Sequence, residues 1–299
     1  MSALVSTASP HSATWTYFEN AWHEGNVAIM GPRTQAAWLG GSVFDGARSY
    51  DGTAPDLDLH MARVNASARA LLLKPVVTVE RWLELAREGI KRFAPDAALY
   101  IRPMYWADSG AGGGVKFDPE TTRWCLCLYE TPMPGPRELS VTLSPFRRPT
   151  IETAPVDAKS GCLYPNGSRA LIEAGQRGFD NCLMNDVLGN VAELANSNVF
   201  MVRDGVVFTP QPNGTFLNGI TRQRVVGLLR GDGVEVVETT LRYADFQTAD
   251  EIFSTGNFAK VSAVTRIDER PLPPGPITGR ASALYRDFAH ATARLDSAA

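Results

Sequence analysis

Lys159 has the most unusual surroundings of the five lysines in this 299-residue chain. It follows Ala154-Pro-Val-Asp-Ala158 and precedes Ser160-Gly-Cys-Leu-Tyr164, a mostly small and apolar neighbourhood. An amine in such a setting has a lowered pKa and can condense with an aldehyde to form a Schiff base. The structural alternative is a lysine whose methylene chain covers apolar surface or whose amine is held in an ion pair.

Two other segments offer groups that bind anions. Leu217-Asn-Gly-Ile-Thr221 precedes a helix predicted to begin at Arg222, and the free amides at a helix start bind phosphate. The alternative is that Thr221 only caps this helix. Ser254-Thr-Gly-Asn257 follows a predicted strand and supplies a second group of small residues and amides. Its alternative is an ordinary turn.

A carboxylate completes the set. Glu193 stands just before the hydrophobic segment Asn198-Val-Phe200, where it is either a solvated residue at a strand entry or the partner of a basic ring nitrogen. A Schiff-base lysine, a phosphate seat and a ring carboxylate are together what pyridoxal 5'-phosphate requires of a protein. The combination therefore predicts this cofactor more strongly than any single member does.

The order and spacing of these motifs resemble the class IV (fold type IV) pyridoxal-phosphate aminotransferases, and most closely the branched-chain amino acid aminotransferase group. The resemblance runs from about Trp38 to Arg266. The segments that carry it are Val43-Phe-Asp-Gly-Ala-Arg48, His60-Met-Ala-Arg63, Ser67-Ala68, Tyr100-Ile-Arg-Pro103, Lys159 with Tyr164, Glu193 with Asn198-Val-Phe200, Gly219-Ile-Thr-Arg222 and Ser254-Thr-Gly256.

The resemblance implies a role for each matching residue. Lys159 would be the catalytic residue, forming the internal aldimine and then moving the proton between the substrate Cα and the cofactor C4′. Glu193 would pair with the pyridinium nitrogen, and Tyr164 would hydrogen-bond the phenolic oxygen of the cofactor. The other cofactor-binding residues expected, chiefly around the phosphate, are Arg63, Leu217, Gly219, Ile220, Thr221, Gly256 and Asn257. The reaction would be ping-pong, and the enzyme a homodimer or a higher homo-oligomer.

The substrate side departs from the branched-chain pattern. Leu39 occupies a position where a tyrosine is usual, and Thr255-Gly-Asn-Phe258 replaces a Ser-Gly-Thr-Ala run. Tyr100 and Arg102 match positions that orient the α-carboxylate and a second carboxylate in that group, and Arg48 matches as well. Arg48 and Arg102 could each instead be a salt-bridged structural arginine. The expected substrate-binding residues are Leu39, Phe44, Arg48, Tyr100, Arg102 and Phe258.

Four interpretations of function follow. The first is an aminotransferase that moves an amino group between a branched-chain-like α-amino acid and a 2-keto acid. The second, motivated by Leu39, Asn257 and Phe258, is an (R)-selective amine transaminase. A D-amino acid aminotransferase or an aminodeoxychorismate-type lyase is the third. A non-catalytic cofactor-binding or scaffold relative is the fourth, and the presence of Lys159, Glu193 and Thr221 disfavours it.

The elements that must position these residues alternate without a regular βαβ order, which favours α+β domains over a doubly wound sheet. We expect strands over 36–44, 98–106 and 123–130 and a helix from Thr78 to Phe93. The run Thr131-Pro-Met-Pro-Gly-Pro136 predicts a linker. The expected organisation is a disordered lead-in (1–14), a small N-terminal α+β domain (15–130), the linker (131–137) and a large cofactor-binding α+β domain (138–299).

Composition excludes several classes of protein. A net charge of −3 provides no diffuse cationic field for nucleic acid or anionic lipid. No apolar run approaches the ~18 residues of a membrane span, and the N-terminus lacks the features of a secretory signal, so a cytoplasmic enzyme is expected. The four cysteines and four histidines lack ligand spacing, so no metal is expected. The expected partners are a small amino donor and a keto acceptor.

Overall fold

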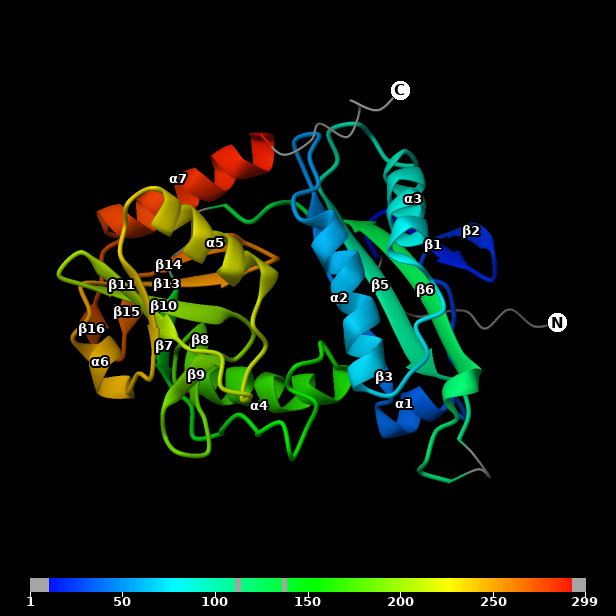
Figure 1. Cartoon of the computed structure of the whole chain (residues 1–299), viewed down its shortest axis with the longest axis horizontal. Helices are drawn as coiled ribbons and strands as arrows, with labels where there is room; N and C mark the ends of the chain where they lie inside the picture. Colours follow the sequence, from blue (N-terminus) through cyan, green and yellow to red (C-terminus); the bar gives the residue numbers. More distant parts are fainter. Residues whose placement is uncertain (1–10, 111–113, 136–138, 292–299) are drawn as a thin grey trace.

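The computed structural model describes residues 11–110, 114–135 and 139–291, and within these ranges the strands form three sheets (Figure 1). Most of the lead-in predicted over 1–14, residues 136–137 of the predicted linker and the end of the chain lie outside the described residues. Thr14, assigned to the lead-in, is instead the first residue of a strand. No helix in the described part is both long and apolar enough to cross a membrane.

The first sheet is antiparallel and is built from the N-terminal residues, in the order β2-β1-β6-β5-β3 with β4 also on β5. Its strands are β1 (Thr14–Phe18), β2 (Ala21–Glu24), β3 (Ser42–Phe44), β4 (Ala47–Ser49), β5 (Leu99–Ala107) and β6 (Thr122–Glu130). Its helices are α1 (Gln35–Leu39), α2 (Leu57–Ala70) and α3 (Val79–Ile90), with the 3-10 turn η2 (Pro119–Thr121) before β6.

Helices α2 and α3 cover one face of this sheet (Figure 1). Trp82, Leu85 and Ala86 lie at helical spacing and are fully buried, so α3 has one apolar stripe against the sheet. Thr78 caps α3 by accepting a hydrogen bond from the amide of Arg81. The predicted helix and the predicted strands of this half, β5 and β6, are confirmed.

The remaining strands form two sheets stacked on each other, in the orders β12-β11-β10-β13-β14 and β16-β15-β7-β8-β9. The strands are β7 (Ser140–Leu143), β8 (Asn181–Asn185), β9 (Val191–Leu194), β10 (Asn198–Arg203), β11 (Val206–Pro210), β12 (Val236–Thr239), β13 (Glu251–Gly256), β14 (Lys260–Val264), β15 (Arg266–Ile267) and β16 (Arg270–Pro271). The helical elements are η3 (Gly161–Leu163), α4 (Tyr164–Gln176), α5 (Ile220–Gly231), α6 (Tyr243–Gln247) and α7 (Pro276–Ala291).

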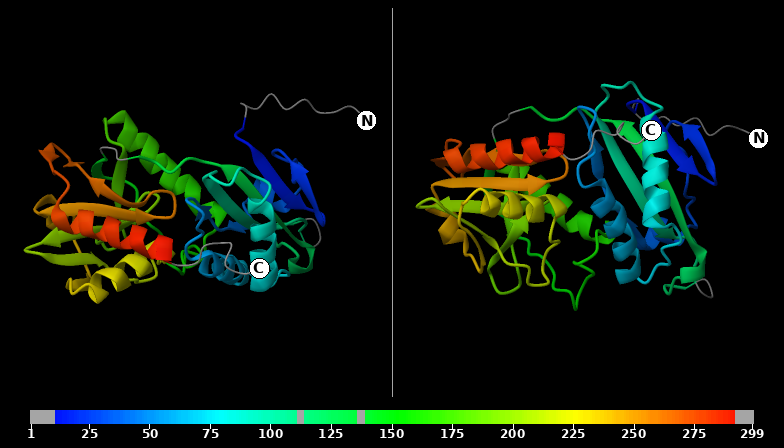
Figure 2. Two further views of the ribbon diagram at one scale, coloured as in Figure 1. Left: turned by 90° about the horizontal axis from the view of Figure 1, so that it is seen from above. Right: turned by 45° about the horizontal axis from the view of Figure 1, so that its top comes forward.

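Strand β10 shows why the sheets stack. Val199 and Met201 pack between the two sheets, whereas Phe200 and Val202 point to the opposite face. That opposite face is covered by α5 and α7, which lie side by side (Figure 2). Helix α4 covers the outer face of the other sheet. These four layers and the separate N-terminal sheet confirm the expected α+β class.

Two local expectations are wrong. The segment 36–44 is not one strand, because Gly40 adopts a left-handed conformation (φ 74°) that ends α1 before β3 begins. The alternative in which Thr221 caps its helix is also wrong: Gly219 occupies the N-cap of α5, and Thr221 lies within its first turn. Asp204 and Gly205, both at positive φ, form the two-residue turn between β10 and β11.

Backbone contacts bring the two halves together at the segment that carries Lys159. The Phe44 amide donates to the Lys159 carbonyl over 3.0 Å, and the Lys159 amide donates to Ser67 Oγ over 3.0 Å. Val43 also pairs with Ser160 as an isolated bridge. Lys159 is therefore fixed between β3, α2 and the start of α4.

Candidate active site

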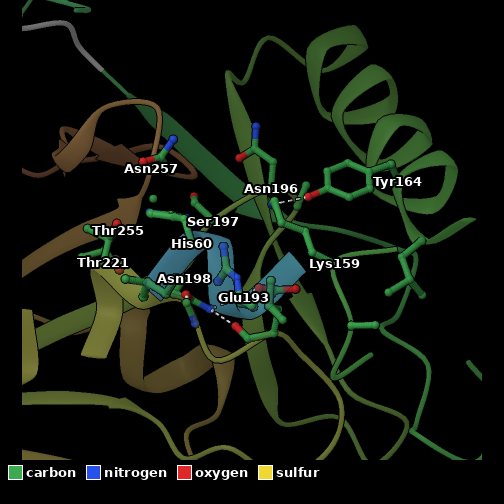
Figure 3. A pocket seen from close by; sticks show the side chains of 18 of the residues that line it. His60, Lys159, Tyr164, Glu193, Asn196, Ser197, Asn198, Thr221, Thr255 and Asn257 are labelled. Carbon is green, nitrogen blue, oxygen red and sulfur yellow. Dashed lines mark hydrogen bonds between the residues drawn. The ribbon is translucent and has the colours of Figure 1, made fainter. Parts of the chain in front are cut away.

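A single pocket gathers all ten residues that the sequence assigns to cofactor binding (Figure 3). Helix α2, the Lys159 segment, the start of α4, β9, the β9–β10 turn, the start of α5 and the end of β13 all contribute to its lining. The expected residues are Arg63, Lys159, Tyr164, Glu193, Leu217, Gly219, Ile220, Thr221, Gly256 and Asn257. The other lining residues are His60, Arg148, Ala158, Leu163, Ala195, Asn196, Ser197, Asn198 and Thr255.

The Lys159 amine is held at one side of the pocket. Its Nζ donates to Tyr164 Oη over 2.6 Å and lies 4.9 Å from the centre of the Phe44 ring. The side chain reaches the pocket but is surrounded by protein, and this burial, helped by the charge of Arg63, lowers its pKa. Burial also raises the pKa of the Tyr164 phenol, so the phenol stays neutral. The pair presents a nucleophilic amine in a fixed position.

Glu193 faces the same pocket with 7% of its surface exposed. Its Oε1 lies 3.2 Å from Arg148 Nε, and its Oε2 accepts a hydrogen bond from Asn198 Nδ2 over 3.2 Å. Burial raises the pKa of Glu193 to about 7, against the opposing charges of Arg148 and Lys159. Because burial destabilises the charged form of this carboxyl, a cationic nitrogen placed beside it would stabilise the carboxylate strongly.

The pH dependence of stability follows from this raised pKa. Between about pH 4.5 and 7 the folded protein holds a proton at Glu193 that the unfolded chain has lost, so without cofactor the free energy of unfolding falls as the pH rises. Glu193→Gln cannot ionise and should be more stable than the wild type at pH 8 by roughly 1–3 kcal/mol, with the difference vanishing near pH 4.5. Urea unfolding of both apoproteins at several pH values measures this. A constant difference across the range would contradict it.

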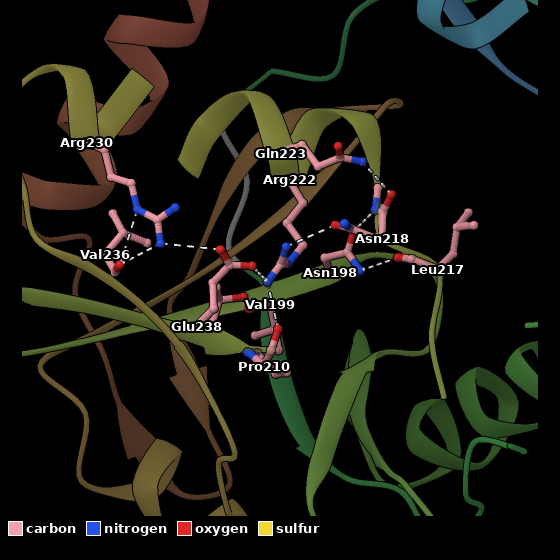
Figure 4. Close-up of polar contacts among 12 residues, drawn as sticks. Asn198, Val199, Pro210, Leu217, Asn218, Arg222, Gln223, Arg230, Val236 and Glu238 are labelled. Carbon is pink, nitrogen blue, oxygen red and sulfur yellow. Dashed lines mark hydrogen bonds and ion pairs between the residues drawn. The ribbon is translucent and has the colours of Figure 1, made fainter. Parts of the chain in front are cut away.

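The anion seat is formed by Leu217, Gly219, Ile220 and Thr221 at the start of α5. It lies across the pocket from Lys159 (Figure 3). Asn198 holds the preceding loop by donating to the Leu217 carbonyl over 2.9 Å and accepting from the Gly219 amide over 3.2 Å (Figure 4). A Cβ on residue 219 would lie 2.3 Å from Asn198 Oδ1, so only glycine fits. Buried Arg222 anchors the first turn through Asn218, Pro210 and Glu238.

Two donors at this seat have no partner in the part of the chain that the structure describes. Thr255 Oγ1 and Asn257 Nδ2 are buried and form no hydrogen bond with any described residue. Both residues line the pocket beside the α5 amides. Because buried donors are normally satisfied, they mark the place of an acceptor such as a phosphate oxygen.

Arg63 reaches the pocket already fixed by Asp45. The Asp45 carboxylate is completely buried and accepts from Arg63 Nε over 2.6 Å and from Arg63 Nη2 over 2.8 Å. Its Oδ1 lies 2.7 Å from His60 Nδ1 and accepts from the Gly46 amide over 2.7 Å. Burial favours the neutral acid, but Arg63 and His60 outweigh it and hold the pKa of Asp45 far below its ordinary value.

The six residues expected to bind substrate do not line this pocket, but some lie next to it. Phe44 packs against Tyr164, with 5.0 Å between ring centres. Arg102 lies 5.2 Å from the ring centre of Tyr100 and 5.0 Å from that of Tyr129, to whose hydroxyl it donates a hydrogen bond. A Cβ on residue 46 would lie 2.0 Å from Tyr100 Oη, so Gly46 is what admits this phenol.

Arg48 is completely buried, donates to the Thr131 carbonyl and lies 5.5 Å from the Phe258 ring. Neither Arg48 nor Arg102 forms an ion pair with any carboxylate of the described residues, so these residues give no support to the salt-bridged alternative. Leu39 ends α1, and Phe258, 46% exposed, lies in the β13–β14 turn.

The residues present fit pyridoxal phosphate. Lys159 offers the amine, Glu193 the carboxylate, and Arg63 with the α5 amides and the two unpartnered donors offers the phosphate site. The described residues contain no group of three or more histidine, cysteine or acidic side chains that could hold a metal.

Comparisons with known proteins agree with this chemistry. The family model "Amino-transferase class IV" matches residues 42–267. The branched-chain-amino-acid aminotransferase of Pseudomonas aeruginosa is 30% identical over 89% of each chain, and a putative one of Methanocaldococcus jannaschii is 33% identical over 83% of this chain and 87% of its own. An aminotransferase from Brucella abortus, crystallised with pyridoxal phosphate, is 57% identical with a TM-score of 0.92, covering 93% of this chain and 99% of its own.

Proposed function

The chain belongs to the class IV aminotransferases, enzymes that use pyridoxal phosphate, and from this premise we propose that it moves an amino group between a branched-chain-like α-amino acid and a 2-keto acid. The observation that carries the proposal is the Lys159 amine, whose pKa is lowered by burial, in one pocket with Glu193 and an anion seat. The names of the curated relatives at about 30% identity support the substrate class.

Several residues of the pocket have distinct tasks in this reaction. Bound pyridoxal phosphate supplies the carbon that takes up the amino group and a ring that accepts electrons. Lys159 Nζ, kept in place by Tyr164, removes and returns the proton at the substrate α carbon. Glu193 stabilises positive charge on a ring nitrogen. Arg63, Thr221 and the α5 amides bind the phosphate group and so fix the orientation of the cofactor in the pocket.

We assign substrate carboxylates to the arginines beside the pocket. Arg48 and Arg102 both have buried guanidinium nitrogens without a partner in the described residues. A guanidinium with spare donors and no internal carboxylate is suited to bind one from the substrate. Arg102 is our candidate for the second carboxylate of a dicarboxylic acceptor, and Phe44, Leu39 and Phe258 for the apolar substrate wall.

A panel of amino donors tests the function. The purified holoenzyme should lose its yellow colour with L-leucine, as the cofactor is converted to pyridoxamine phosphate. Bleaching only by D-alanine or only by (R)-1-phenylethylamine would overturn the proposal in favour of the D-amino acid or (R)-amine interpretation. Release of pyruvate without an acceptor would indicate a lyase. These alternatives are not favoured, because the curated relatives are branched-chain aminotransferases.

Arg102→Ala should weaken acceptors with two carboxylates selectively. Losing one charge-assisted contact raises the KM for 2-ketoglutarate by roughly 10-fold or more, whereas pyruvate changes by less than about 3-fold. Steady-state kinetics with both acceptors measures this. Arg92→Ala is the matched control, because Arg92 also contacts two aromatic rings, those of Trp15 and Trp22, and does not line the pocket. Equal losses for both acceptors would remove Arg102 from this role.

The organisation of the chain is also proposed here. We assign residues 15–130 to a small domain and 138–299 to a large cofactor-binding domain, with a linker over 131–137. The separate origin of the sheets supports this, since the first uses strands between 14 and 130 and the others strands between 140 and 271. A homodimer and a cytoplasmic location complete the proposal.

A further inference from the structure

A second lysine is buried close to the anion seat. Lys260 begins β14, is 6% exposed, and adopts a positive φ of 64° that a lysine rarely takes. Its amine lies 5.9 Å from the ring centre of Tyr50 and 5.7 Å from that of Tyr285. It forms no ion pair with a carboxylate of the described residues, although buried lysines are usually paired.

The hydrogen bond of this amine goes to Asn257. Lys260 Nζ donates to Asn257 Oδ1 over 2.7 Å, across the short β13–β14 turn. An ammonium group can only donate hydrogen bonds, so it donates to the amide oxygen and repels the amide NH2. The contact therefore selects one of the two orientations of the Asn257 amide.

The selected orientation leaves the amide nitrogen for the pocket. Asn257 Nδ2 is buried without a partner in the described residues, and Asn257 lines the pocket together with Thr221 and Thr255. Figure 3 shows Asn257 on the same side of the pocket as Thr221 and Thr255, away from Tyr164. The flipped amide would present its oxygen to an anion and repel it.

We propose that Lys260 is a positioning residue, which turns the NH2 group of Asn257 toward the anion seat so that it donates to the phosphate of the cofactor. The proposal rests on the proposed function, because that function supplies the phosphate. Lys260 itself does not touch the cofactor; it acts through Asn257.

The cost of placing a lysine here supports a role beyond packing. Burial and the nearby charge of Arg48 lower the pKa of Lys260 to about 7, against a weaker opposing effect of Asp56. A methionine of similar length would fill the same space without this desolvation penalty. The retained amine is therefore explained by its polar contact with Asn257.

A double-mutant cycle on the apoprotein tests the proposal. Lys260→Met should weaken binding of pyridoxal phosphate about 10-fold, whereas binding of pyridoxal, which lacks the phosphate, should change less than 2-fold. In the Asn257→Ala background, Lys260→Met should have no further effect on pyridoxal phosphate. Lys260→Gln, whose amide can donate to the same oxygen, should recover most of the affinity.

Three outcomes would overturn it: an unchanged affinity in Lys260→Met, an equal loss for pyridoxal, or the same loss with and without Asn257. Ser262→Ala, in the same strand, is the control for effects of substitution on the hairpin. Thermal unfolding of each apoprotein shows whether it is folded. If Lys260→Met does not fold, Lys260→Gln carries the test. Failure of the proposed function has a different signature, because then the wild-type apoprotein would not bind pyridoxal phosphate at all.

Discussion

Replacement of Lys159 by alanine should abolish transamination, lowering kcat by roughly 10⁴-fold or more, and should leave the protein folded. The described pocket contains one lysine amine, fixed by Tyr164 and by the Ser67 and Phe44 backbone contacts, and no other lining side chain can replace it as nucleophile and base. The variant should also lose the yellow colour of the bound cofactor. Absorbance spectra and steady-state kinetics measure both losses.

Two controls make this result specific. Lys91→Ala, at the exposed end of α3, should keep full colour and activity. Borohydride reduction of the wild-type holoenzyme followed by peptide mapping should place the cofactor on Lys159. Labelling of Lys260 instead, the other lysine whose pKa burial strongly lowers, would show that the wrong amine has been assigned.

Asp45→Asn should destabilise the protein by about 3–5 kcal/mol, the usual effect of removing one partner from a buried ion pair. The substitution keeps the shape but turns one carboxylate oxygen into an NH2 donor. Each oxygen already accepts from Arg63, and Oδ1 also contacts His60, so a donor would face a donor. Urea unfolding of the apoprotein measures the loss.

An exposed ion pair provides the comparison. Arg81 and Glu84 lie 3.0 Å apart on the surface of α3, and Glu84→Gln should cost no more than about 0.5 kcal/mol. The affinity of Asp45→Asn for pyridoxal phosphate should also fall, because Arg63 is no longer held toward the pocket. A loss of stability as small as that of Glu84→Gln would refute the importance of the buried cluster.

Much of the site could be predicted from the sequence because its residues lie in short local motifs. Lys159, Glu193 and the Gly219-Ile-Thr221 segment each have a recognisable chemical setting, and all three meet in the pocket. Arg148 was missed because nothing near it in the chain indicates its partner. Arg148 lies in the loop that follows β7, and Glu193 lies on β9. Their contact therefore depends on β8, which pairs with both strands.

Other residues were visible in the sequence but their tasks were not. Asp45 and His60 lie in two of the segments that carry the family resemblance. Their contact, however, depends on the packing of α2 over the β3–β4 turn. Lys260 offered only an ordinary position after a strand, and the orientation of one amide cannot be read from residue spacing. Residues 36–39 were misassigned because their continuous apolar run resembles a buried strand and hid the stop imposed by Gly40.

The close approach of Gly46 to Tyr100 has a consequence for how this enzyme could acquire new specificities. Beside the pocket, the main chain at Gly46 lies against Tyr100, and any larger residue at position 46 would displace the phenol that stacks on Tyr129. That position is therefore closed to gradual change by single substitutions. Leu39 and Phe258 are exposed and lie outside the core, so their size can vary at little cost to core packing, although a change at Phe258 also alters its contact with Arg48. With the apolar substrate wall proposed above, divergence toward other amines and acids should accumulate at those two positions, while Gly46 is kept.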